Sequence, residues 1–145
     1  MTPAMRDAVV AEAKTWLGTP WRHMQRIKGV GVDCANLPAA VYEACGVIEH
    51  VEAEYPRQWM LHRKQDRFIE WILAVGGREI DEAGLLPGDL VLWKFGLTFS
   101  HSGFWLGDGS VLHAQIDVGV AYGDMTRDID LSERERRCFT VGSAE

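Results

Sequence analysis

The chain has 145 residues, which is enough for one domain with a hydrophobic core of its own. Charged residues make up 25% of the chain and hydrophobic residues 47%, as in ordinary globular proteins. The net charge of −6 argues against a protein that depends on attraction to nucleic acid or to an anionic membrane surface. The sequence contains no repeat and no linker, so we predict a single domain over residues 1–145.

The sequence lacks the usual signals for export, for membrane insertion and for covalent or metal cross-links. Residues 1–14 carry charges and lack the apolar run of a signal sequence, and no stretch approaches the roughly 20 apolar residues of a membrane span. Three cysteines do not suggest a disulfide framework, and no cluster has zinc-ligand spacing. We therefore expect a protein made in the cytoplasm without a signal peptide, with no membrane span, metal or cofactor.

The first part of the chain is predicted to form two helices. One helix begins at Pro3, a residue that suits a first helical position, and the chain turns away at Gly18. The second covers about residues 35–45. Its start is set by Pro38, because a proline without an N–H is tolerated only in the first turn of a helix. Cys34 therefore lies immediately before this second helix.

After an ambiguous stretch at 47–63, a third helix is predicted over about 64–75, and the pattern then changes to strands. Alternation and turn signals predict strands at 90–93, 101–106, 110–116, 118–122 and 137–141. Residues 123–136 are charged and are expected to be exposed. Helices followed by an antiparallel meander indicate an α+β fold, with N-terminal helices packed on an antiparallel sheet of about five strands.

Cys34 is the strongest candidate for chemistry. Most lone cysteines are small buried hydrophobic residues, and we interpret Cys45 and Cys138 in that way. Cys34 differs because it opens a helix, where the positive end of the helix dipole lowers a thiol pKa. Unpaired N–H groups in the first turn also face any oxyanion that forms beside the sulfur. This combination is typical of a nucleophile in acyl transfer.

Two histidines, His101 and His113, lie on the two strands of one predicted hairpin. A three-residue loop at 107–109 pairs Leu106 with Ser110 and makes the histidines diagonal neighbours on one face of the sheet. A two-residue turn would place them on opposite faces. A joint role for the histidines therefore requires an odd-length loop or a bulge. The alternative is that both are ordinary strand histidines with local partners.

These residues predict a cysteine hydrolase. Cys34 and His101 would form a thiolate–imidazolium pair, the thiolate would attack an amide carbonyl, and His101 would protonate the leaving amine before water hydrolyses the thioester. His113 would hold the His101 ring in its productive tautomer, with Gln115 as the reserve candidate for that role. His23, in the loop before Cys34, is a further candidate for a substrate contact.

Five motifs in this order resemble those of a known family, the NlpC-type cell-wall peptidases, which are papain-like cysteine peptidases. The resemblance is greatest to their phage-associated branch. The matching segments are LGTPW at 17–21, GVDC at 31–34, LPGDLV at 86–91, SHSGFWLGDG at 100–109 and LHA at 112–114. Each motif is weak alone, but five in family order across most of the chain make a fairly specific match.

The resemblance implies a papain-like fold and cleavage of peptides in bacterial peptidoglycan, typically next to D-glutamate and a diamino acid. It assigns Cys34 as nucleophile, His101 as base and His113 as the third polar residue, and it implies no metal. The phage-associated members resemble tail-tip or tail-assembly hydrolases. It therefore implies that phage tail proteins are partners and that a phage tail delivers the chain to the cell wall.

The sequence departs from the family pattern in two places, at residue 21 and at residues 35 and 36. Many members carry a tyrosine near the nucleophile where this chain has Trp21, and tryptophan has no phenol hydroxyl to offer to the thiol or the oxyanion. The cysteine is often followed by Ser-Gly, whereas here Ala35 and Asn36 follow it. Asn36 is a candidate hydrogen-bond donor to the site or a residue that only helps the helix to start.

Two other functions remain open at this stage. The same Cys–His site could pass the acyl group to an acceptor other than water, as an acyl- or peptidyl-transferase. The chain could also be a catalytically inactive structural component of a phage tail with a papain-like fold. The presence of Cys34, His101 and His113 together speaks against the inactive component, whereas the sequence does not separate the hydrolase from the transferase.

Overall fold

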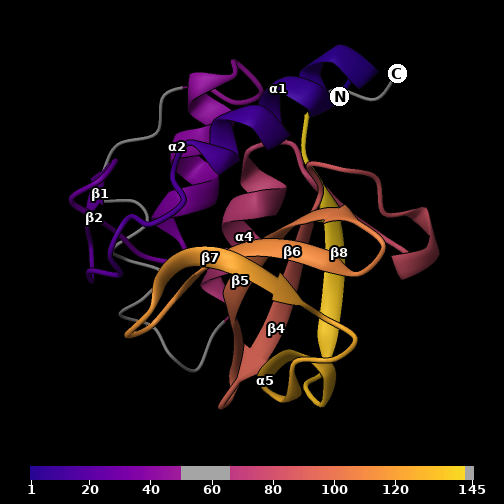
Figure 1. Cartoon of the computed structure of the whole chain (residues 1–145). Coiled ribbons are helices and arrows are strands. Elements are labelled where there is room, and N and C mark those ends of the chain that lie inside the picture. The colour runs from indigo at the N-terminus through magenta and orange to yellow at the C-terminus, as the bar shows by residue number, and fades with distance from the viewer. Residues whose placement is uncertain (50–65, 143–145) are drawn as a thin grey trace.

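The computed structural model describes residues 1–49 and 66–142 and shows helices packed on a twisted antiparallel sheet (Figure 1). The helical segments are α1 (Pro3–Lys14), α2 (Asn36–Ala44), α4 (Arg67–Ala74), the 3-10 turn η1 (Glu82–Gly84) and α5 (Ile129–Ser132). The strands are β1 (Arg26–Ile27), β2 (Gly31–Val32), β3 (Arg78–Ile80), β4 (Leu90–Phe95), β5 (Thr98–Gly107), β6 (Ser110–Gln115), β7 (Gly119–Asp124) and β8 (Arg136–Thr140). The predicted α+β class is confirmed.

The first two helices begin where the local sequence predicts. Thr2 caps α1, because its hydroxyl oxygen accepts a hydrogen bond from the Met5 N–H at 3.0 Å. The α2 helix begins at Asn36, so Pro38 lies in its first turn and Cys34 lies just outside it. The third predicted helix, about 64–75, is observed as α4 and begins later than predicted, since Asp66 is not helical; residues 64 and 65 lie outside the described residues. No helix in the described ranges is long and apolar enough to cross a membrane.

The main sheet is larger than predicted. It has six strands in the order β3-β8-β4-β5-β6-β7, and each neighbouring pair is antiparallel. The missed strand is β3, a three-residue edge strand whose residues are exposed or half-buried, so it carries no apolar alternation to detect. A separate two-stranded ribbon, β1–β2, leads into Cys34.

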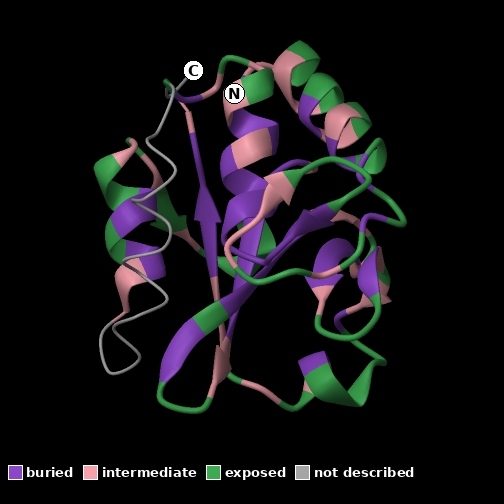
Figure 2. Cartoon of the chain, turned by 90° about the vertical axis from the view of Figure 1, so that its left-hand side faces the viewer, coloured by how far each residue is buried: buried purple, intermediate pink, exposed green. Residues whose placement is uncertain are grey.

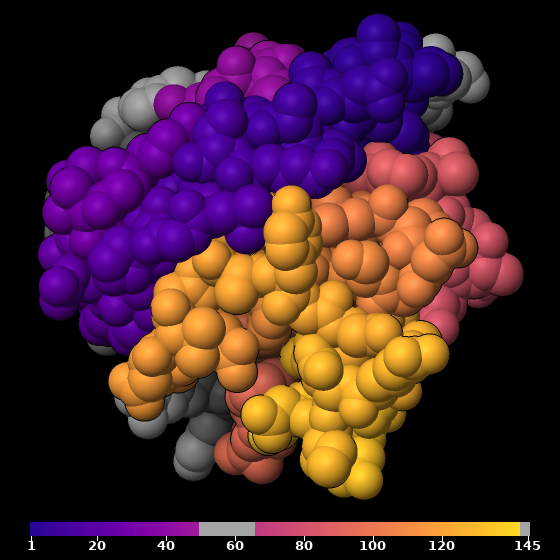
Figure 3. Space-filling model, in the orientation of Figure 1, coloured from indigo at the N-terminus to yellow at the C-terminus, as the bar shows by residue number. Residues whose placement is uncertain are grey.

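Both faces of the central sheet are covered, and β4 shows this most clearly. Leu90 and Leu92 point into the cluster that the helices cover, whereas Val91 and Trp93 point into a second cluster on the other face. Strands in the interior are accordingly buried along most of their length (Figure 2). In the space-filling view, the N-terminal residues (indigo to purple) lie beside the residues of the C-terminal, strand-forming half (orange to yellow) on one face of the molecule (Figure 3).

The second cluster corrects the prediction for residues 123–136. Most of that segment is exposed or half-buried, but Met125 and Leu131 are each 2% exposed. Leu131 belongs to the short helix α5, and both side chains belong to the same hydrophobic cluster as Trp93 and Val111 of the sheet. Two isolated apolar residues in a charged segment give no periodic signal, so the sequence did not show that they cover this face.

The hairpin of β5 and β6 has the register that the site requires, but by a different route. Gly103 pairs with His113, as the three-residue loop predicted. The predicted pair of Leu106 with Ser110 was wrong, since Gly107 pairs with Ser110 and the register shifts between Trp105 and Gly107. A two-residue turn and a bulge therefore place His113 on the face that an odd-length loop would have given.

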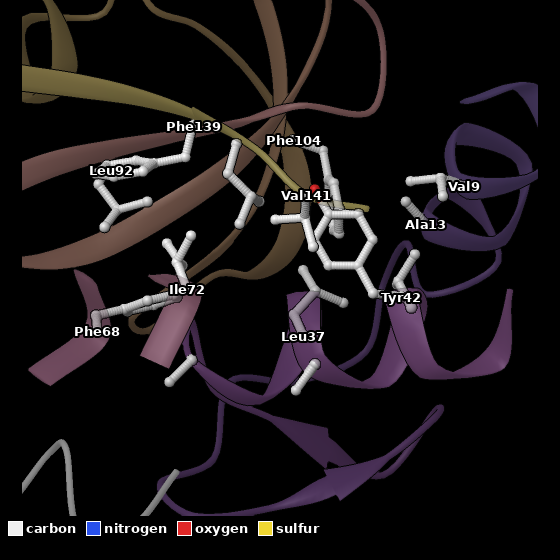
Figure 4. Packing of buried hydrophobic residues seen from close by; sticks show 14 of the residues in the cluster. Val9, Ala13, Leu37, Tyr42, Phe68, Ile72, Leu92, Phe104, Phe139 and Val141 are labelled. Atoms are coloured by element: carbon white, nitrogen blue, oxygen red, sulfur yellow. The ribbon is translucent and has the colours of Figure 1, made fainter. Parts of the chain in front are cut away.

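Tyr42 ties α2 to the turn that starts β4. It is fully buried, its ring meets Phe104 edge-on at 5.4 Å between centroids, and its hydroxyl donates to the Gly88 carbonyl at 2.6 Å. Figure 4 shows Tyr42, Leu37 and Phe104 together in the core between the helices and the sheet. This contact fixes the helix that carries Cys34 at its N-terminal end.

We predict that Tyr42→Phe lowers the free energy of unfolding by about 1–3 kcal/mol, because the Gly88 carbonyl loses a buried donor. The matched control is Tyr122→Phe, since Tyr122 is 54% exposed and its loss of a hydroxyl should change stability by less than about 0.5 kcal/mol. Urea denaturation of both variants measures the difference. Equal midpoints would contradict a structural role for the Tyr42 hydroxyl.

Candidate active site

A buried carboxylate sets the position of Cys34. Asp33 is fully buried, and its Oδ1 accepts hydrogen bonds from the backbone N–H and from Nδ2 of Asn36, both at 2.9 Å. Its Oδ2 accepts a hydrogen bond from the Met24 N–H at 2.7 Å. Asp33 therefore caps the start of α2 and holds the preceding loop, and Cys34 is fixed between them.

These contacts decide between the two roles considered for Asn36. Its Nδ2 is bonded to Asp33, and its Oδ1 accepts a hydrogen bond from Nε of Arg26 at 3.3 Å. The amide is thus engaged in the helix start and in contacts with the β1–β2 ribbon. Asn36 helps the helix to begin and does not offer a donor to the sulfur in this structure.

Cys34 lies against the segment of β5 that carries His101. Its Sγ donates to the Ser100 carbonyl at 3.2 Å, and its own carbonyl accepts from the Ser102 hydroxyl at 2.7 Å. Ser100 is the extra residue of a bulge, because Trp93 pairs with His101 and Lys94 pairs with Phe99, which leaves Ser100 without a partner in β4. Within residues 1–49 and 66–142, no hydrogen bond joins Sγ directly to His101.

The two histidines meet as the register predicted. His101 Nε2 and His113 Nδ1 are 2.8 Å apart, and both rings are buried. The Trp93 ring lies beside them, with its centroid 5.7 Å from that of His101. Gly103 leaves the space that this requires, since a β-carbon there would stand 3.2 Å from Trp93 and 3.3 Å from His113. The remaining ring nitrogen of His101 is Nδ1.

The electrostatic prediction for the nucleophile was wrong in direction. Burial, with a smaller contribution from the adjacent Asp33 carboxylate, raises the pKa of Cys34 to about 12. The backbone N–H groups of Cys34 and Ala35 act on the sulfur and lower its pKa, as expected at a helix start, but the loss of solvation is larger. Cys34 is therefore a neutral thiol at pH 7.

His101 is also neutral at pH 7. Burial, with smaller contributions from the neighbouring His113 and Arg134, lowers the pKa of His101 to about 3. The predicted thiolate–imidazolium pair is thus not the resting state of this structure. The site holds a thiol and a neutral imidazole, and charge has to develop during the reaction.

The structure does not bring the other candidate residues to the two histidines. Gln115 lies at the end of β6, opposite Gly119, and the nitrogen of His101 that it was expected to orient is occupied by His113. Trp21 and His23 stack on each other at 6.1 Å, and His23 is exposed. Trp21 bridges to the strand that leads into Cys34, and its Nε1 is buried without a hydrogen-bond partner among the described residues.

Sequence reasoning missed three residues that shape the site, namely Asp33, Ser102 and Trp93. Asp33 had a usable signal, because an acidic residue directly before a helix start is a typical capping residue. Ser102 and Trp93 act across the fold, and only the register of β4 with β5 reveals them. In the described ranges, no group of three or more His, Cys, Asp or Glu side chains could hold a metal ion.

The sequence model of the NlpC/P60 family matches residues 17–133, a range that contains all five motifs. Among curated proteins, a murein DD-endopeptidase MepS/murein LD-carboxypeptidase of Escherichia coli K12 is 23% identical over 121 residues. That match covers 83% of this chain and 55% of the relative, so the chain spans about half the relative's length.

Solved structures share the fold. The NlpC/p60 domain of the peptidoglycan hydrolase SagA has a TM-score of 0.62 at 22% identity, covering 91% of this chain and 96% of that one. NlpC1 from Trichomonas vaginalis has a TM-score of 0.69 at 18% identity, covering 98% and 44%. RipD from Mycobacterium tuberculosis, described as non-catalytic and adapted to peptidoglycan binding, has a TM-score of 0.61 at 15% identity, covering 92% and 95%. The predicted papain-like fold is thereby confirmed.

We predict that Cys34 behaves as a buried thiol of high pKa. Its rate of alkylation by iodoacetamide should still rise at pH 10, because the thiolate fraction keeps growing toward a pKa of about 12. The same cysteine in the urea-unfolded chain should level off near its ordinary pKa of about 8.5. Mass spectrometry of each cysteine peptide gives both pH profiles.

The shape of the profile separates pKa from access, since restricted access scales the rate equally at every pH. Cys45, which is half-buried at the C-terminal end of α2, serves as the internal reference in the same digest. A plateau for Cys34 below pH 8, or faster alkylation at pH 6 than in the unfolded chain, would contradict the neutral resting state.

Proposed function

The chain belongs to the NlpC/P60 family, and on that premise we propose that it is a cysteine peptidase that hydrolyses peptide bonds in the stem peptides of bacterial peptidoglycan. The observation that carries the proposal is the arrangement of three side chains. Cys34 is hydrogen-bonded to Ser100 and Ser102, the residues of β5 on either side of His101. His101 is hydrogen-bonded in turn to His113. Nucleophile, base and orienting residue thus occur in the order that acyl transfer needs.

The first half of the reaction forms a thioester. The thiol proton of Cys34 passes to Nδ1 of His101 as Sγ attacks the substrate carbonyl carbon, and the carbonyl oxygen becomes an oxyanion. In this proposal the oxyanion is stabilised by the backbone N–H groups that act on Sγ, those of Cys34 and Ala35. When the intermediate collapses, the C–N bond breaks and His101 returns the proton to the leaving amine.

The second half restores the enzyme. A water molecule gives a proton to Nδ1 of His101 and attacks the thioester carbonyl. The C–S bond then breaks, the sulfur regains the proton from His101, and the peptide leaves with a new carboxyl group. Because Cys34 and His101 are both neutral at rest, proton transfer accompanies each attack rather than preceding it.

Peptidoglycan is the substrate that the relatives favour. The E. coli relative is named a murein endopeptidase, and the SagA domain comes from a peptidoglycan hydrolase. The position of the scissile bond next to D-glutamate, and delivery to the cell wall as part of a phage tail, follow from the motif resemblance and remain predictions. An acyl acceptor other than water would make the same site a transferase.

The second candidate function is peptidoglycan binding without hydrolysis. Two observations favour it: the thiol of Cys34 has a raised pKa, and the fold is shared with RipD, whose description is non-catalytic. The presence of Cys34 together with the bonded histidine pair favours the enzyme, because binding alone does not require a thiol beside an imidazole.

We predict that Cys34→Ala abolishes the release of new amino groups from purified peptidoglycan, with a loss of at least about 1,000-fold, because no other group can form the thioester. Cys45→Ala is the matched control and should keep full activity, since Cys45 lies at the far end of α2. Far-UV circular dichroism and urea midpoints show whether both variants fold.

The assay also separates the candidate functions. Wild type that sediments with peptidoglycan of several chemotypes but releases no amino groups would support binding and contradict the hydrolase. Amide products formed with an added amine, in place of new carboxyl groups, would instead support the transferase.

A further inference from the structure

His113 has a second ring nitrogen that the proposed mechanism leaves unused. Because Nδ1 of His113 is bonded to His101, Nε2 lies on the opposite side of the ring and faces β7. There it lies over Gly123, where an added β-carbon would stand only 2.9 Å from Nε2. Gly123 does not have a positive φ, so the glycine is needed for space rather than for backbone conformation.

The carboxylate of Asp128 lies over the same glycine. Its Oδ2 would stand 3.2 Å from that added β-carbon, and it accepts a hydrogen bond from the Asp124 N–H at 2.8 Å. The turn between β7 and α5 therefore holds the carboxylate in place. Among the described residues, no hydrogen bond joins Asp128 to His113, so the carboxylate acts on Nε2 through its charge.

We propose that Asp128 is a positioning residue that selects, through His113, the tautomer in which His101 Nδ1 is unprotonated. A carboxylate on the Nε2 side favours the His113 tautomer with its proton on Nε2. Nδ1 of His113 is then an acceptor, so His101 Nε2 must be the donor in the 2.8 Å hydrogen bond. Neutral His101 then has its lone pair on Nδ1, free to take the Cys34 proton.

Among the charged and titratable groups around His101 and His113, Asp128 is the charged group that acts on His113. Among the described residues, the titratable β5 side chain against His113 is His101, and from β4 the uncharged Trp93 ring lies beside it. Burial lowers the pKa of His113, and Asp128 opposes that fall. Arg134, which follows α5, acts on His101 and not on His113.

The test compares Asp128→Asn with Asp130→Asn. The Asn side chain keeps an oxygen for the Asp124 N–H, so Asp128→Asn removes the charge while retaining the turn. Asp130 lies two residues on, is exposed, and has its backbone carbonyl rather than its carboxylate bonded to Arg134. It therefore controls for the loss of one negative charge from the same part of the chain.

The first readout is ¹⁵N NMR of the histidine rings, which reports which nitrogen carries the proton. We expect wild type and Asp130→Asn to show protons on Nε2 of both His101 and His113, and Asp128→Asn to show a mixture of tautomers. A wild-type spectrum with the His113 proton on Nδ1, or an unchanged spectrum in Asp128→Asn, would overturn the proposal. This readout does not depend on catalysis, so it stands apart from the success of the proposed function.

The second readout is the rate of peptidoglycan hydrolysis against pH, and it rests on the proposed function. Asp128→Asn should lower the rate about 3- to 10-fold, the size expected of a solvent-screened charge that acts through another residue. The acidic limb of the pH–rate profile of Asp128→Asn should move to lower pH, because the carboxylate that favours protonated imidazole has been removed. The difference from wild type should shrink in 1 M salt, which a purely structural role would not produce. If Asp130→Asn gave the same pH–rate profile as Asp128→Asn, the effect would come from the change in net charge alone. That result would reject Asp128 as a positioning residue.

Discussion

The buried carboxylate of Asp33 is the constraint on which the arrangement of the site depends. Through three hydrogen bonds it joins the loop at Met24 to the start of α2 at Asn36, and Cys34 has no freedom between these anchors. The same negative charge opposes ionisation of the neighbouring thiol. Asp33 thus fixes the nucleophile and also adds to the rise in the thiol pKa that burial causes, so the residue that orders Cys34 opposes its ionisation.

One strand of the sheet, β5, carries the base His101 and also holds the nucleophile Cys34 by hydrogen bonds. Within β5, a bulge at Ser100 precedes the segment that begins with His101, and a second bulge at Leu106 follows it. The first bulge removes the Ser100 carbonyl from the regular ladder and leaves it free to accept the Cys34 thiol. The second bulge sets the register that brings His113 to His101. Two irregularities, rather than the regular ladder, therefore assemble the three side chains.

The extent to which this could be predicted follows from the range of each interaction. Pro38 gave the start of α2 because its effect is local, and alternation gave the strands that form the middle of the sheet. The register was predicted only as a condition, since a bulge at Leu106 has no distinct sequence signal. The ionisation of Cys34 was predicted in the wrong direction, because a helix start is visible in the sequence and desolvation by packed neighbours is not.

The neutral resting pair has a consequence for how such a site works. In a site where Cys34 and His101 were already ionised, the imidazolium would carry protons on both ring nitrogens and its tautomer would not matter. Where both are neutral, only the tautomer with a bare Nδ1 can accept the thiol proton, and the other tautomer is inert. Burial therefore shifts the requirement from charge stabilisation to control of a single proton position, and the hydrogen bond between His101 and His113 becomes the interaction through which that control is exerted.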